Sequence, residues 1–218
     1  MLPRILTFSV MLIVVAVPGS SQSQYLQNVP SEQDPVQSRA VEAVSNWVSK
    51  TAIKLRGAEP GQPRNDMQPL KSTVANARVV ALGEATHGTR EFSQIKHRFL
   101  EFLVQDMGFT IYAIEAPMAE AFDLNEYVLQ GKGDPAQLLS GLEFWTVNTE
   151  EVLELVNWMR QYNENPRNKR KRKFYGLDMQ AGTRAAKNAL AYLKRIDPSI
   201  ETDARLRWLT DALSRAIF

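Results

Sequence analysis

The segment "LEFLVQDMGFTIYAIEAPMAEA" (residues 100–121) contains the end of one helical pattern, a strand and the beginning of a second helix. Gly108 stops the first pattern, and the apolar, β-branched run 109–117 then reads as a strand. This run is apolar on both alternating faces until Glu115, as expected where helices cover both sides of a sheet. Pro117 has a fixed φ that suits the first turn of a helix. The order of these signals predicts a helix–strand–helix unit.

The same alternation extends along the chain. Apolar residues recur at helical spacing in segments 36–55, 67–75, 91–108, 118–130, 148–165, 183–195 and 201–218, with a short helix expected within 131–142. Two more short apolar runs, 78–84 and 173–180, are expected to be strands, and Asn148 with Glu151 is expected to form a capping box. Strands that alternate with helices imply right-handed crossovers and a parallel sheet. The sequence therefore predicts a helix-rich α/β fold with a parallel sheet core flanked by helices.

The composition limits the class of partner. The chain has 218 residues, a net charge of +2 and no cysteine, which excludes disulfides and thiolate chemistry. This charge gives no reason to expect a nucleic-acid partner. The basic run "RNKRKRK" (residues 167–173) has no interleaved aromatic residue, so we expect a solvated loop there.

The N-terminus has the pattern of an export signal. Arg4 precedes an apolar stretch, 5–17, that is too short to span a bilayer, and small polar residues follow. We expect residues 1–23 to be a signal peptide, so that the mature protein is periplasmic or extracellular without stable membrane insertion. Residues 24–66 then form a leader and a helix, and 67–218 an α/β domain. Three strands are few for such a domain, and the last helical pattern reaches the final residue without a stop signal, so we expect a truncated chain.

Polar residues follow each expected strand. Glu84 and His87 come after the first, Glu115 ends the second, and Asp178 and Gln180 end the third. Ligands of parallel sheets bind at the carboxyl ends of the strands, which meet at one edge. These five residues are therefore candidates for one site. The alternative is that the carboxylates only cap the helices that follow.

His87 is the candidate for acid–base chemistry. Gly83 and Gly88 bracket its turn and permit a rigid loop, and glutamates beside the ring would orient it. A neutral, oriented imidazole can take a proton from water, which predicts hydrolysis of an activated carbonyl. The alternative is a metal site of one histidine and carboxylates, although the chain has no H-E-x-x-H spacing. The second histidine, His97, is expected on the helix surface.

Four ordered motifs carry a family resemblance. "GEATHGTREF", "LVQDMGFTIYAIEAPMAEA", "TEEVLELVNWMRQYN" preceded by a tryptophan, and "FYGLDMQ" resemble the erythromycin esterase family, which includes members labelled as succinoglycan-biosynthesis proteins. The resemblance covers residues 79–180. It implies a hydrolase without metal or cofactor that opens a macrolide lactone by attack of water, an activity of antibiotic resistance. It implies that His87 is the general base and that Glu84 and Glu115 line the site.

The sequence departs from the family pattern in two respects. Lys96 stands where the esterases carry an arginine, and Arg98 follows two residues later, so both are candidates for substrate binding. A lysine cannot donate the paired hydrogen bonds of a guanidinium. Family members are also longer, with further histidines in their C-terminal half. Two other interpretations therefore stay open: a catalytically incomplete exported binding domain, and a metal-dependent hydrolase.

Overall fold

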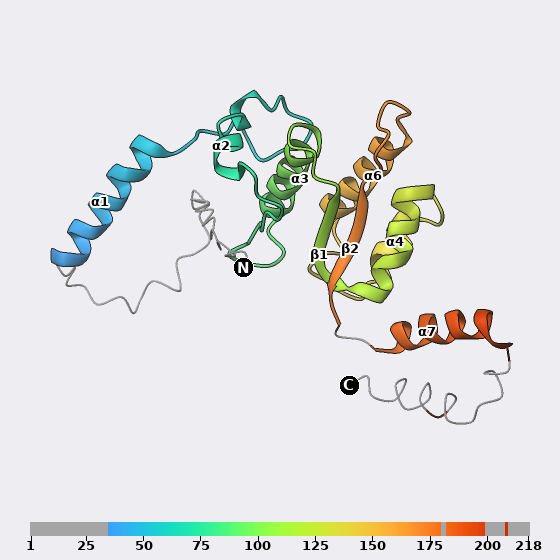
Figure 1. Cartoon of the computed structure of the whole chain (residues 1–218). Helices are drawn as coiled ribbons and strands as arrows, with labels where there is room; N and C mark the ends of the chain where they lie inside the picture. Colours follow the sequence, from blue (N-terminus) through green and yellow to red (C-terminus); the bar gives the residue numbers. More distant parts are fainter. Residues whose placement is uncertain (1–34, 180–181, 199–207, 209–218) are drawn as a thin grey trace, which may run out of the picture. The chain divides into compact units, whose positions relative to one another are not determined.

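The computed structural model describes residues 35–179, 182–198 and 208 (Figure 1). Its elements are, in chain order, α1 (Pro35–Thr51), the 3-10 turn η1 (Asn65–Met67), α2 (Leu70–Val74), α3 (Arg90–Gln105), β1 (Ile111–Pro117), α4 (Met118–Gln130), α5 (Pro135–Ser140), α6 (Glu150–Glu164), β2 (Lys173–Asp178) and α7 (Thr183–Ile196). The expected signal peptide, Gln180 and most of the expected helix 201–218 lie outside the described residues. No helix among the described residues is long and apolar enough to cross a membrane.

The described chain forms two compact units, each considered by itself. The first contains the described residues up to 57 together with 63–85, and the second contains 58–62 together with the described residues from 86 onward. In the first unit, α1 confirms the expected helix, and η1 and α2 replace the helix expected at 67–75. The Arg56 N–H donates to the Asp66 carboxylate at 2.8 Å, which closes the loop between α1 and η1.

The strand expected at residues 78–84 is wrong. Residues 79–84 have no regular secondary structure, and Val79 is 82% exposed. A strand needs a neighbour for its backbone N–H and C=O groups, and an apolar run of this length does not specify one. The sheet of the described residues accordingly has two strands where the sequence predicted three.

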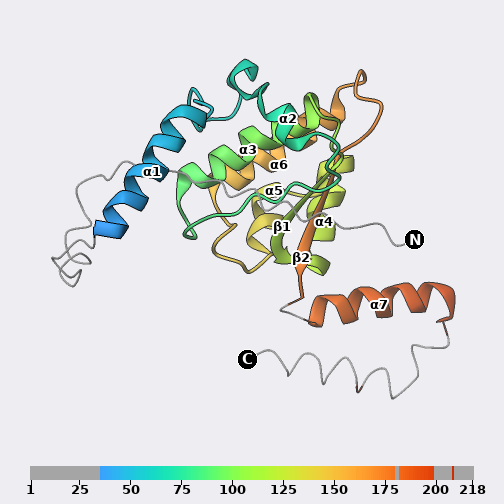
Figure 2. The same cartoon turned by 60° about the vertical axis from the view of Figure 1, so that its left-hand side comes forward.

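The second unit is built on a parallel pair of strands covered by helices. β1 pairs with β2, with Tyr112 opposite Phe174 and Pro117 opposite Asp178. α4 packs against β2 and α6, and α6 packs against α3, which lies beside it (Figures 1 and 2). The predicted α/β class, a small parallel sheet flanked by helices, is confirmed.

The core lies between the helices and one face of this sheet. Its buried side chains are Leu100, Val104, Ala116, Ala121, Leu124, Val128, Leu139, Leu142, Val147, Val152, Leu155, Val156, Met159 and Phe174. The apolar stripe predicted for α6 supplies four of these, Val152, Leu155, Val156 and Met159. The opposite face of the sheet is less covered, since Ile111 is 55% and Leu177 71% exposed.

Two asparagine side chains bond the backbone at the start of β2. Buried Asn163 accepts from the Arg172 N–H at 2.7 Å and donates to the Arg172 and Val128 carbonyls, as a neighbouring strand would. Asn125 of α4 accepts from the Phe174 N–H at 3.0 Å. Edge strands leave backbone groups without partners, and these amides supply partners for some of these groups at the start of β2.

Gly176 allows the two strands to approach each other. A Cβ at this position would lie 2.4 Å from the Ala116 carbonyl oxygen and 2.7 Å from that of Pro117. No side chain fits there without moving the backbone. The register of the ladder is irregular at the same place, between Ile114 and Pro117.

Three smaller expectations need correction. His97 was expected on the surface but is only 4% exposed, because α3 also packs against α6 on this face, where His97 contacts Trp158. The N-cap of α6 is Thr149, not Asn148, since its hydroxyl accepts from the Val152 N–H. The basic run is not wholly solvated, because Arg172 is buried.

Burial of His97 predicts a specific pH dependence of stability. Burial lowers the pKa of His97 from 6.5 to about 4. Between these values the unfolded chain binds a proton that the folded chain does not, so the free energy of unfolding falls as the pH is lowered from 6.5 towards 4. The contribution of this residue changes by about 1.4 kcal/mol per pH unit, and by roughly 3 kcal/mol in total.

Urea unfolding at several pH values measures this dependence. We expect His97→Phe to remove a large part of the slope between pH 4 and 6.5, whereas His87→Gln, at the exposed histidine, keeps it. Equal slopes in the two variants would contradict a neutral, buried His97.

Candidate active site

The carboxyl ends of β1 and β2 form the edge where the sequence placed the candidate site. Asp178 ends β2 opposite Pro117, and Glu115 lies two residues before Pro117 on β1. Glu115 is exposed and Asp178 half-buried. One Asp178 carboxylate oxygen accepts from the Met179 N–H at 2.7 Å, so this side chain also shapes the exit from the strand. The structure thus brings two of the predicted acids to adjacent strands.

His87 lies in an exposed turn just before α3. Gly88 has a φ of +76°, which an L-residue rarely adopts, and Thr89 is the N-cap of the helix. The hydroxyls of Thr86 and Thr89 are 2.8 Å apart and share a hydrogen bond across the turn. The turn is therefore closed on both sides of His87, while the imidazole stays accessible to solvent.

Trp145 is the neighbour of this turn that sequence reasoning did not single out as a site residue. Its ring meets the His87 ring edge to face, with centroids 6.5 Å apart and planes at 84°. A Cβ on Gly88 would lie 3.3 Å from the same indole, so the missing side chain permits the contact. Trp145 is 72% exposed in the turn between α5 and α6, which is unusual for so large an apolar ring. An exposed tryptophan in a short interhelical turn was the available signal.

An ion pair joins the two helices that carry this corner. Arg90 Nε at the start of α3 lies 3.0 Å from a carboxylate oxygen of Glu151 in the first turn of α6. Glu151 is mostly buried, while Arg90 is exposed. The pair therefore holds the N-termini of α3 and α6 together, next to the turns that bear His87 and Trp145.

The remaining predicted residues lie in different surroundings. Glu84 is exposed in the first unit. Lys96 is half-buried on α3, and Arg98 is fully buried, so contact between Arg98 and a dissolved substrate would require its surroundings to move. Gln180 lies outside the described residues. In the part of the chain that the structure describes, no three His, Asp or Glu side chains are grouped to hold a metal ion.

Comparison with known proteins gives a consistent result. The sequence profile of the family described as erythromycin esterase matches residues 104–213, a range that includes Glu115 and Asp178 but begins after His87. The chain is 32% identical, over 133 residues, to erythromycin esterase type II of Escherichia coli. That match covers 61% of this chain but only 31% of the esterase, so the chain spans about a third of this relative.

Two crystal structures resemble the fold. A Bacillus cereus protein superposes with a TM-score of 0.66 at 37% identity, covering 73% of this chain and 38% of that chain. A succinoglycan biosynthesis protein superposes with a TM-score of 0.69 at 33% identity, covering 83% of this chain and 45% of that chain. Both are substantially longer than the region they share with this chain.

The contact between Gly88 and Trp145 predicts an effect on stability. Gly88→Ala places a side chain at a positive φ and against the indole, so we expect it to cost roughly 1–2 kcal/mol of unfolding free energy. Gly83→Ala is the matched control, because a Cβ there meets nothing within 4 Å. Urea denaturation of both variants checks the prediction, and an equal cost at the two glycines would show that the turn is not constrained as described.

Proposed function

Since the chain belongs to the erythromycin esterase family, we propose that it is a hydrolase that opens an ester or lactone by attack of water. The observation that carries the proposal is the placement of an exposed histidine in a closed turn at the start of α3. The similarity to erythromycin esterase type II supports a macrolide-like lactone as the substrate class. Because the chain spans about a third of that relative, the proposal concerns the chemistry of this site and includes no partner other than a small molecule.

In the proposed reaction His87 is the general base. The imidazole removes a proton from water as the water oxygen attacks the acyl carbon, which forms a tetrahedral intermediate with a negatively charged oxygen. The bond from the acyl carbon to the alcohol oxygen then breaks, and the imidazolium returns the proton to that oxygen. The products are a carboxylic acid and an alcohol, and His87 is again neutral.

The other predicted residues have supporting roles in this proposal. Glu115 orients the attacking water, and Glu84 has the role of a site residue that the family resemblance implies. Lys96 donates to the oxygen that becomes negative, which is the function that positioned donors serve in acyl transfer. Asp178 and Gln180 contribute to substrate binding, and Arg98, which is fully buried, does so once its surroundings move. Trp145 adds an apolar wall beside the imidazole.

We also propose that the protein acts outside the cytoplasm. The support is the N-terminal sequence, with a basic residue, a short apolar stretch and small residues before Gln24. The absence of cysteine makes such a protein independent of the redox state of its compartment.

Loss of the general base should abolish most of the turnover. We expect His87→Ala to lower the rate of hydrolysis of erythromycin or a p-nitrophenyl ester by about 10²–10⁴-fold. Glu115→Gln should also lower it, whereas Glu154→Gln, at an exposed carboxylate on α6, should not. The measurement is the appearance of the ring-opened acid by mass spectrometry, or of nitrophenolate by absorbance.

The outcomes separate the proposal from its alternatives. Unchanged turnover in His87→Ala would remove His87 from the mechanism. Saturable binding of a lactone without turnover by the wild-type chain would favour a binding domain. Turnover that chelator abolishes and zinc or manganese restores would favour a metal-dependent hydrolase.

A further inference from the structure

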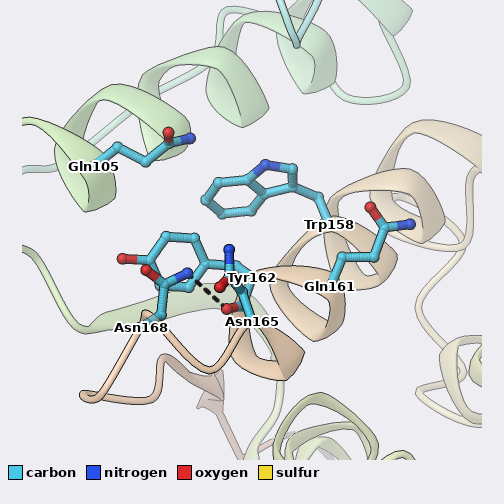
Figure 3. A pocket seen from close by; sticks show the side chains of 6 residues that line it. All are labelled: Gln105, Trp158, Gln161, Tyr162, Asn165 and Asn168. Atoms are coloured by element: carbon cyan, nitrogen blue, oxygen red, sulfur yellow. Dashed lines mark hydrogen bonds between the residues drawn. The ribbon is translucent and has the colours of Figure 1, made fainter.

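A polar cavity of about 460 Å³ lies at the end of α3 and α6, and Figure 3 shows the side chains that line it. It is lined by Gln105, Trp158, Gln161, Tyr162, Asn165 and Asn168. Gln105 is the last residue of α3, whereas His87 precedes its first residue, and 16 helical residues separate the two ends by roughly 22 Å. The cavity is therefore distinct from the proposed hydrolytic site, and binding of a ligand there does not require hydrolysis at His87.

The lining combines two aromatic rings with four side-chain amides and no charged group. Gln105 and Gln161 make no side-chain hydrogen bond with any residue that the structure describes, so their donors and acceptors are available. Asn168 uses its NH₂ on the Tyr162 carbonyl, at 2.8 Å, and keeps its oxygen; Asn165 accepts from the Arg167 N–H and keeps its NH₂. Paired donors and acceptors thus converge from several directions.

Buried neighbours fix the positions of the two aromatic rings in the lining. The Trp158 ring contacts Tyr162, with centroids 5.6 Å apart, and buried His97, at 5.7 Å. The Arg172 guanidinium lies 4.8 Å over the Tyr162 ring and donates to the Tyr162 hydroxyl at 2.9 Å. Because that hydroxyl oxygen accepts from Arg172, its own proton can be donated elsewhere. Two buried side chains, His97 and Arg172, thus support the aromatic lining of the cavity, which a merely solvated loop would not need.

These features select a class of ligand. Trp158 and Tyr162 already contact each other, so a flat aromatic ligand cannot enter between them. Aromatic rings beside amides suit the C–H face of a sugar ring, whose hydroxyls radiate towards the amide groups. An uncharged polar lining disfavours burial of an ionic group in the cavity itself. The volume falls in the range of about 300–1,000 Å³ that is usual for small-molecule sites.

We propose that this cavity binds one sugar ring of a saccharide. The basic run adjoins it, since Asn165 and Asn168 belong to the same loop as the exposed Arg167, Lys169 and Arg170. No aromatic residue is interleaved in this run, which is typical of a solvated loop, but the fold places the aromatic residues of α6 beside its first residues. A saccharide with carboxylates on its neighbouring rings would gain electrostatic attraction there, while the ring in the cavity is recognised by the same neutral groups.

Isothermal titration of the whole 218-residue chain tests the proposal. The probes are two neutral trisaccharides, maltotriose and cellotriose, and one acidic trisaccharide with two neutral rings, 3′-sialyllactose, each at low and high salt. We expect saturable binding of at least one probe. Gln161→Ala should weaken this binding about tenfold, which corresponds to the loss of one hydrogen bond, and Trp158→Leu should abolish it. Gln137→Ala, at an exposed glutamine of α5, is the matched control and should bind as the wild type does.

The arms distinguish the source of affinity. Binding of 3′-sialyllactose alone, weakened by salt, assigns a role to the basic run beside the cavity. Salt-independent binding of a neutral probe assigns recognition to the cavity alone, and both results support the proposal. It is overturned if no probe binds, if Gln161→Ala binds like Gln137→Ala, or if a nucleotide such as UMP binds more tightly than every saccharide. Gln161 is exposed, so its replacement should leave the protein folded. A cooperative thermal unfolding transition of the variant checks this.

Discussion

The parallel pairing of β1 and β2 is the constraint on which the second unit depends. Two parallel strands cannot be joined by a short turn, so the chain between them must cross over, and it does so through α4, α5 and α6. The two strands lie so close at Gly176 that no side chain is possible there. Side-chain amides bond the backbone at the start of β2: Asn125 accepts from the Phe174 N–H, and buried Asn163 bonds the backbone of Arg172 just before the strand. The ladder, the crossover and these amides together fix which ends of the elements meet.

This arrangement gives the unit two ends with different chemistry. The strand carboxyl ends carry Glu115 and Asp178, and the starts of α3 and α6, joined by the Arg90–Glu151 ion pair, carry the turns of His87 and Trp145. Among these groups Glu115, His87 and Trp145 are exposed, as proposed for an acyl-transfer site. At the other ends of the same helices the lining is made of neutral amides over a braced aromatic pair. The first end suits proton transfer, and the second suits recognition of hydroxyl groups without chemistry.

Much of this could be predicted from local patterns, because the signals were local. Gly108, Pro117 and the apolar run between them defined β1 and its flanking helices, and the stripe of α6 was correct except for its cap. The errors concern partners that no local pattern encodes. The run at residues 78–84 looked like a buried strand, but periodicity does not say which strand would pair with it. His97 looked exposed between Lys96 and Arg98, yet α3 packs on more than one side, so its charged neighbourhood was a poor guide to burial. Likewise, no local pattern predicts that Trp158 and Tyr162 lie beside the basic run, because only the fold brings them together.

The central claim is that a neutral imidazole at position 87 removes the proton from the attacking water. Chemical rescue tests it most directly: hydrolysis of a lactone or p-nitrophenyl ester by His87→Gly is measured with increasing concentrations of added imidazole at several pH values. We predict that imidazole restores turnover, in proportion to the concentration of its unprotonated form, and that it does not accelerate the wild type. A His87→Gly variant that keeps the full rate, or one that no form of imidazole restores while the protein stays folded, would contradict the account.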